Sequence, residues 1–128
     1  MKTILIDAID TFIVDDAVFT EMQELLDSYP NPKMVVTNAD YEEGSDSIFN
    51  RLPYPVYTMR HNPDKTDPAY FVALFSHLGL TKDDVVYFEH NPEAVASAQS
   101  VGIESYRFDD TKRDLSALKE FLDAAVTA

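Results

Sequence analysis

The chain has 128 residues, of which 45% are hydrophobic and 12% aromatic, and this composition fits one globular domain with a single core. It contains no cysteine, which excludes a disulfide scaffold and any thiolate nucleophile or metal ligand. With 23 acidic against 10 basic residues the formal net charge is −13, so nucleic acid and anionic membranes are disfavoured as partners.

The N-terminal residues Met1-Lys2 lead directly into a short apolar run that is followed by acids. Signal peptides and membrane spans need longer apolar stretches with different flanks, so we expect neither here and expect a cytoplasmic protein. The excess of acids does not steer phosphorylated substrates towards the protein, and it is typical of a surface that keeps a small protein soluble.

Short apolar runs and amphipathic segments alternate in the first half of the chain. Apolar residues on one helical face over 17–29 predict a helix capped by Asp15 or Asp16. A second, shorter helix is expected within 42–51. The apolar runs themselves predict three strands, at residues 3–6, 33–36 and 55–58.

The start and stop signals are sharper in the second half. Asp67-Pro68 predicts a helix start with proline at the first helical position, and Gly79 predicts the end of that helix. Asn91 begins the next helix, which Gly102 closes. Two more strands are expected at residues 85–88 and 103–108, and a last helix along the stripe of Leu115, Leu118, Phe121, Leu122 and Val126.

This alternation of strands and helices implies right-handed crossovers and a parallel sheet with helices on both faces. We therefore expect residues 1–128 to form a single three-layer α/β domain with a five-stranded, Rossmann-like sheet. Ligands of such sheets bind beyond the carboxyl ends of the strands, so the residues just after each strand are the candidates for a functional site.

Polar residues with complementary chemistry stand at these strand ends. They are Asp7 after the first strand, Thr37 and Asn38 after the second, Lys65 ahead of the helix that follows the third, and Glu89 and His90 after the fourth. A carboxylate can attack phosphorus, a hydroxyl and an ammonium can hold phosphate oxygens, and a polar cluster can hold a cation. The set predicts a site that handles phosphate.

Four segments resemble, in order, the motifs of the haloacid dehalogenase-like hydrolase superfamily, and together they extend over essentially the whole chain. The family's motifs are a strand ending in Asp-x-Asp-x-Thr, a strand ending in Thr or Ser, a Lys ahead of a helix, and a strand ending in acidic residues. The matching segments are ILIDAIDTF, MVVTNAD, KTDPAYF and VVYFEHNPEAVASAQSVGI. Each match is weak alone, but four at successive strand ends imply the core fold of this family.

The resemblance implies a role for each of three residues. Asp7 falls on the nucleophile that forms an aspartyl-phosphate, Thr37 on the hydroxyl that binds the transferring group, and Lys65 on the cation that neutralises it. Thr37, Asn38 and Lys65 would then bind a phosphorylated small molecule or macromolecule. The implied activity is that of a phosphatase-type hydrolase acting through Asp7.

Two positions depart from the family's pattern. The second aspartate of the first motif, which protonates the leaving group, falls on Ile9, and the neighbouring Asp10 leaves the backbone in another direction. The metal-binding aspartate of the fourth motif falls on His90, just after Glu89. The resemblance thus implies either a Mg²⁺ site at Asp7, Ile9, Glu89 and His90 or no cofactor, because imidazole is a poor exchange for an oxygen ligand of magnesium.

These departures predict phosphatase activity that is weak or lost. The alternative is a non-catalytic binding or protein-interaction module on the same fold, which could form a homodimer. Residues 12–33 have room only for a flap and one helix, and residues 59–65 for a short loop, so we expect no cap domain over the site.

Two rival families are disfavoured. The dehalogenase branch dispenses with the second aspartate and with magnesium, which would explain Ile9, but its small-substrate members enclose their site under a cap domain. A response-regulator receiver domain needs an aspartate after the third strand, where this chain has Thr58-Met59-Arg60.

Overall fold

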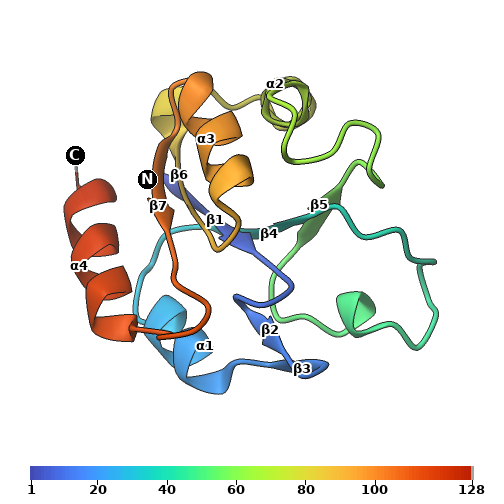
Figure 1. Ribbon diagram of the computed structural model, residues 1–128, viewed down its shortest axis with the longest axis horizontal. Coiled ribbons are helices and arrows are strands. Elements are labelled where there is room, and N and C mark those ends of the chain that lie inside the picture. The colour runs from blue at the N-terminus through green and yellow to red at the C-terminus, as the bar shows by residue number, and fades with distance from the viewer. Residues whose placement is uncertain (128) are drawn as a thin grey trace.

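The computed structural model of the protein describes residues 1–127 and contains a five-stranded parallel sheet in the order β5-β4-β1-β6-β7 (Figure 1). The strands of this sheet are β1 (Thr3–Asp7), β4 (Lys33–Thr37), β5 (Val56–Thr58), β6 (Val85–Glu89) and β7 (Glu104–Arg107). The α-helices in this range are α1 (Thr20–Asp27), α2 (Ala69–Leu78), α3 (Pro92–Ser100) and α4 (Leu115–Ala125). The α/β architecture predicted from the sequence is confirmed.

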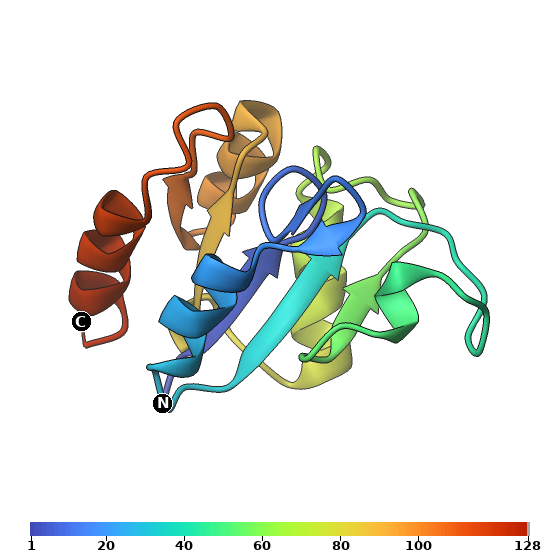
Figure 2. The same cartoon turned by 90° about the horizontal axis from the view of Figure 1, so that it is seen from below.

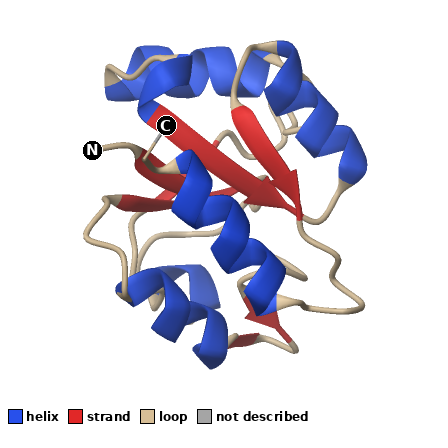
Figure 3. Ribbon diagram, turned by 90° about the vertical axis from the view of Figure 1, so that its left-hand side faces the viewer, coloured by secondary structure: helices blue, strands red, loops and turns tan. Residues whose placement is uncertain are grey.

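Two of the three inner strands, β1 and β6, consist almost entirely of buried residues, as expected for parallel strands that are covered on both faces. Alternate side chains point to opposite faces of the sheet. Ile4 and Ile6 pack in one apolar cluster with α1 and α4, whereas Leu5 packs in a second cluster with α2 and α3. Figure 3 shows these helices on both sides of the strands.

The loop after β1 is anchored in the first of these clusters. Its residues Ala8, Phe12 and Ile13 are all buried there. Full burial of a large apolar side chain such as Phe12 stabilises the fold by about 1.5–3 kcal/mol. The anchored loop fixes the backbone on the C-terminal side of Asp7, at the edge of the sheet where the strands end (Figure 2).

A short hairpin replaces the first part of the helix predicted over 17–29. Its strands are β2 (Ile13–Val14) and β3 (Ala17–Val18), and they pair antiparallel across Asp15 and Asp16. These two aspartates have positive φ angles of 52° and 59°, which a two-residue hairpin turn favours and which Asp tolerates better than most residues. The prediction that either aspartate caps a helix is therefore wrong.

Three other boundaries shift. Helix α1 begins only at Thr20, and the helix expected within 42–51 is reduced to the 3₁₀ turn η1 (Ile48–Asn50). Helix α2 begins one residue later than predicted, at Ala69, whose amide donates a 2.9 Å hydrogen bond to Asp67 Oδ1. A second 3₁₀ turn, η2 (Lys82–Asp84), leads into β6.

Two helix-end predictions are confirmed. Gly79 ends α2 with a left-handed φ of 66°, and its amide donates to the carbonyl of Phe75. Asn91 caps α3, where its side chain accepts a hydrogen bond from the amide of Glu93. No helix within residues 1–127 has the length and apolar character that crossing a membrane would require.

Candidate functional site

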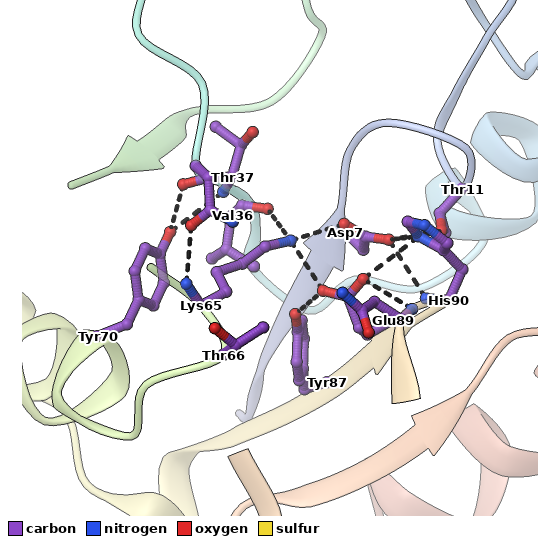
Figure 4. A network of polar contacts seen from close by, with 12 residues as sticks. Asp7, Thr11, Val36, Thr37, Lys65, Thr66, Tyr70, Tyr87, Glu89 and His90 are labelled. Carbon is purple, nitrogen blue, oxygen red and sulfur yellow. Dashed lines mark hydrogen bonds and ion pairs between the residues drawn. The ribbon is translucent and has the colours of Figure 1, made fainter. Parts of the chain in front are cut away.

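The predicted strand-end residues converge on one pocket at the carboxyl edge of the sheet (Figure 4). Asp7 ends β1 and Glu89 ends β6. Two positions before Asp7 is Leu5, and two positions before Glu89 is Tyr87; both of these buried residues pack on the face of the sheet that α2 and α3 cover. Because side chains alternate along a strand, both carboxylates lie on that face. The pocket has a volume of about 230 Å³ and is lined by Asp7, Ile9, Thr37, Asn38, Ala39, His61, Lys65, Thr66, Glu89, His90, Asn91 and Ala94.

Lys65 joins the two carboxylates. Its Nζ donates to Asp7 Oδ1 at 2.7 Å and to Glu89 Oε1 at 2.8 Å, and its third contact is the carbonyl of Val36 at 3.3 Å. Only 6% of Lys65 is exposed, which is rare for a lysine without charged partners. Burial by itself would lower the pKa of Lys65, but the charges of Asp7 and Glu89 outweigh burial and raise it.

The other oxygen of Asp7, Oδ2, accepts three hydrogen bonds. The donors are Thr11 Oγ1 at 2.7 Å, His90 Nδ1 at 2.5 Å and the amide of His90 at 3.2 Å. Burial favours the neutral acid and would raise the pKa of Asp7, but Lys65 and the hydrogen bonds from His90 lower it far below the usual range. Asp7 is therefore a carboxylate at neutral pH.

Glu89 is held as tightly as Asp7. The hydroxyl of Tyr87 donates to Glu89 Oε1, and the amide of Asn91 donates to Oε2 at 3.1 Å. His90 Nδ1 lies 3.3 Å from the same Oε2 atom. Burial and the negative charge of Glu89 raise the pKa of Tyr87 well above its usual value, so the phenol keeps its proton.

The end of β4 is fixed by contacts from α2 and its preceding loop. The hydroxyl of Tyr70 donates to the carbonyl of Thr37 at 2.9 Å and accepts from the amide of Thr37 at 3.1 Å. The side-chain oxygen of Asn38 accepts from the amide of Lys65 at 2.8 Å, which ties the lysine's loop to the strand end. Thr37, Asn38 and Lys65 thus share one wall of the pocket.

Ile9 lines the pocket and is 48% exposed, so an apolar side chain stands at the position where the family's motif has an acid. Asp10 is exposed with a φ of 64°, and it is absent from the described residues that line the pocket. Its carboxylate nevertheless lies within 4.8 Å of a ring nitrogen of His90, at the rim of the site.

Sequence reasoning missed two polar side chains that support the site, Tyr70 and Tyr87. Thr11, the threonine of the first motif, was given no role, and it donates to Asp7 Oδ2. Tyr70 was assigned only to an apolar stripe, and Tyr87 only to a buried strand. Tyr87 stands two residues before Glu89 on the same strand, so both side chains lie on one face of the sheet. This spacing could have identified Tyr87 from the sequence as a partner of Glu89.

The residues at this edge do not fit magnesium as they are arranged. Ligand atoms of Asp7, Glu89 and His90 lie within 4.8 Å of one another, as a metal site requires. However, all four carboxylate oxygens of Asp7 and Glu89 already accept hydrogen bonds. Lys65 donates to one oxygen of each carboxylate, His90 donates to the other oxygen of Asp7, and the amide of Asn91 donates to the other oxygen of Glu89. Magnesium favours an octahedron of oxygens, and here an imidazole nitrogen already lies against both carboxylates.

No protein-family model matches the chain, and no curated protein matches it. An uncharacterized protein from Corynebacterium glutamicum has a similar structure, with a TM-score of 0.69 at 15% identity over 96% of each chain. A HAD family enzyme from Bacteroides thetaiotaomicron, solved as a mutant with magnesium and inorganic phosphate, matches with a TM-score of 0.59 at 16% identity. That match covers 85% of this chain and 61% of the enzyme.

The chain has a haloacid dehalogenase-like fold. Identities of 15% and 16% establish the fold alone, and this chain spans 61% of the length of the Bacteroides enzyme. The fold predicted from the four motif-like segments is confirmed, and the pocket lies at the edge of the sheet where ligands of such folds bind.

Proposed function

We propose that the pocket binds phosphate esters and that the protein is a phosphatase-type hydrolase of weak activity, acting through Asp7. The observation that carries this proposal is the direct contact of Asp7 with Lys65 in a pocket that Thr37 and Asn38 also line. A buried carboxylate beside an ammonium pairs a nucleophile with a charge that can neutralise phosphate oxygens. The phosphate bound in the Bacteroides enzyme of the same fold supports this choice of ligand.

Of the two oxygens of Asp7, Oδ1 is the better nucleophile. Oδ2 accepts three hydrogen bonds, whereas among residues 1–127 Oδ1 accepts only the bond from Lys65. A carboxylate oxygen has two lone pairs, so Oδ1 keeps one for phosphorus. In the first step the Oδ1–P bond forms and the bond from phosphorus to the ester oxygen breaks, with its electron pair leaving on that oxygen.

The aspartyl-phosphate formed in this way must then be hydrolysed. Water attacks phosphorus, the Oδ1–P bond breaks, and Asp7 and inorganic phosphate are released. The leaving oxygen of the first step needs a proton, and the water of the second step needs a base. The side chain of Ile9 can act neither as the acid nor as the base. General acid–base catalysis of this kind typically raises the rate by about 10²–10⁴-fold. We therefore expect aryl phosphates, whose leaving oxygen needs no proton, to react faster than alkyl phosphates.

The second candidate function is a non-catalytic module that binds a phosphorylated small molecule or macromolecule. It is favoured by the exposed Ile9 in the pocket and by the fully bonded Oδ2 of Asp7. We further propose that the site is capless, because the chain between β1 and α1 forms only the β2–β3 hairpin. An open site of this kind suits a macromolecular ligand.

Hydrolysis of p-nitrophenyl phosphate and of an alkyl phosphate tests the proposal. We expect at most slow turnover of the aryl ester, negligible turnover of the alkyl ester, and loss of all activity in Asp7→Asn. Ile9→Asp should raise turnover, more strongly for the alkyl ester, by up to about 10²–10⁴-fold. Val72→Asp is the matched control, because Val72 is an exposed apolar residue on α2 and its replacement should leave the rates unchanged.

Two outcomes contradict the proposal. If the unaltered protein hydrolyses alkyl phosphates rapidly and Asp7→Asn abolishes this activity, another residue supplies the proton and the role given to Ile9 is wrong. If neither ester is hydrolysed but inorganic phosphate binds, and Lys65→Met abolishes binding, the non-catalytic module is the correct function.

A further inference from the structure

Two side chains, those of Lys65 and His90, connect the two buried carboxylates of the site in the same way. Lys65 contacts Oδ1 of Asp7 and Oε1 of Glu89, at 2.7 Å and 2.8 Å. His90 Nδ1 contacts the remaining oxygens, Oδ2 of Asp7 at 2.5 Å and Oε2 of Glu89 at 3.3 Å. Each carboxylate therefore gives one oxygen to the lysine and the other to the histidine (Figure 4).

We infer that the imidazole of His90 occupies the position between the two carboxylates that a divalent ion would need, so that the pocket binds phosphate without a divalent metal ion. The part of this inference that concerns phosphate rests on the proposed function. The part that concerns metal rests on the contacts of His90 alone. A carboxylate can only accept hydrogen bonds, so the Nδ1 atom that contacts Asp7 and Glu89 carries a proton.

Hydrogen bonds to the backbone of His90 fix the position of its ring. The amide of His90 donates to Asp7 Oδ2, and its carbonyl accepts from Arg107 Nε at 3.2 Å. The next residue, Asn91, caps α3, which fixes the chain on the other side. With its backbone held at these points and its side chain 25% exposed, His90 occupies the edge of the pocket beside both carboxylates.

A divalent ion would need the oxygens that the ring already contacts. Magnesium binds oxygen at about 2.0–2.1 Å and requires near-octahedral geometry. Because Oδ1 of Asp7 is bonded to Lys65 and is the oxygen left for phosphorus, the ion would take Oδ2, which the ring of His90 already contacts. The displaced imidazole would then stand beside the ion or lose its buried partners. In the unaltered protein each carboxylate already contacts both Lys65 and His90.

Magnesium titration of His90→Asp tests the inference. This variant replaces the ring by a third carboxylate, and we expect magnesium to bind it at least about tenfold more tightly than the unaltered protein, a difference of about 1.4 kcal/mol. The measurements are calorimetry with magnesium chloride and the shift of the unfolding temperature with magnesium. His77→Asp is the matched control, because His77 lies on α2 away from the pocket and the same substitution there should not create a magnesium site.

Inorganic phosphate is the second probe. We expect the unaltered protein to bind it equally well with magnesium and with EDTA, and His90→Asp to bind it only with magnesium. EDTA that abolishes phosphate binding to the unaltered protein would overturn the inference, as would magnesium binding as tight as that of His90→Asp.

The possible failures are distinguishable. If no variant binds phosphate under any condition, the proposed function fails, while the magnesium titration still decides the role of His90. If His90→Asp does not fold, the titration is made on the unaltered protein and His90→Asn. Absence of magnesium binding to the unaltered protein then supports the inference, and specific binding that Asp7→Asn abolishes overturns it.

Discussion

Replacement of Lys65 by methionine removes the ammonium between two buried carboxylates while keeping most of the apolar stem. Lys65 is 6% exposed, and its partners Asp7 and Glu89 are 2% and 1% exposed. After the substitution Oδ1 of Asp7 and Oε1 of Glu89 face each other without the cation that both contact. The energetic question is how much the uncompensated negative charge costs.

Removing one partner of a buried ion pair typically costs about 3–5 kcal/mol, because the other charge is left without compensation. The entropy of unfolding is about 2.1 cal/mol/K per residue, which gives about 270 cal/mol/K for a chain of 128 residues. The expected destabilisation therefore lowers the melting temperature by about 11–19 °C. Lys65 lowers the pKa of Asp7, so without it Asp7 takes up a proton more readily, and the loss of stability should be smaller at low pH.

Urea unfolding and thermal unfolding, followed by circular dichroism, measure the effect. Lys119→Met is the matched control, because Lys119 makes a contact of similar length, 2.6 Å, with Asp123 on the surface of α4. Both side chains of that pair are at least half exposed, and such surface pairs contribute only about 0.2–1 kcal/mol. The double variant Lys65→Met/Glu89→Gln should recover part of the lost stability. Equal losses for the two lysine variants would refute the role given to burial at Lys65.

Two further predictions concern stability. Hydrogen bonds to Asp7 and Glu89 raise the pKa of His90 from 6.5 to about 10, so its stabilising contribution is complete below pH 6.5 and is lost as the pH rises through about 10. The difference in free energy of unfolding between the unaltered protein and His90→Asn should therefore shrink over this pH range, and a constant difference would contradict the prediction. Gly79→Ala should cost about 1–2 kcal/mol in urea unfolding, because Gly79 has a φ of 66° and an added Cβ has no atom within 4 Å to clash with, which leaves backbone strain as the only cost.

Local signals in the sequence determined much of the fold. The apolar runs that became β1 and β6 are buried on both faces, and that burial explains why their residues are apolar without alternation. Gly79 and Asn91 marked helix ends correctly because the physical causes, a left-handed backbone and a side-chain cap, act within a few residues. The order of the strand ends then placed Asp7 and Glu89 at one edge of the sheet.

The same local reasoning failed at Asp15 and Asp16. Aspartate suits both a helix N-cap and a turn with positive φ, so its presence could not distinguish between the two. Pairing of Ile13 with Val18 decides for the turn, because Ile13 is buried in the core and holds the hairpin there. That choice depends on packing against the rest of the chain and is not encoded in the periodicity of residues 17–29.

Which atoms meet in the site was decided only by the tertiary structure. Lys65 is 58 residues from Asp7 in the sequence and His90 is 83 residues from it, so no local pattern constrains their contacts. The resemblance to the family's motifs implied an imidazole at position 90 in place of a carboxylate, and weak magnesium binding was predicted from that exchange. The path of the chain between β6 and α3 turns the ring between Asp7 and Glu89, because the backbone of His90 is bonded to Asp7 and Arg107. The fold thereby places an imidazole between the two carboxylates, opposite Lys65.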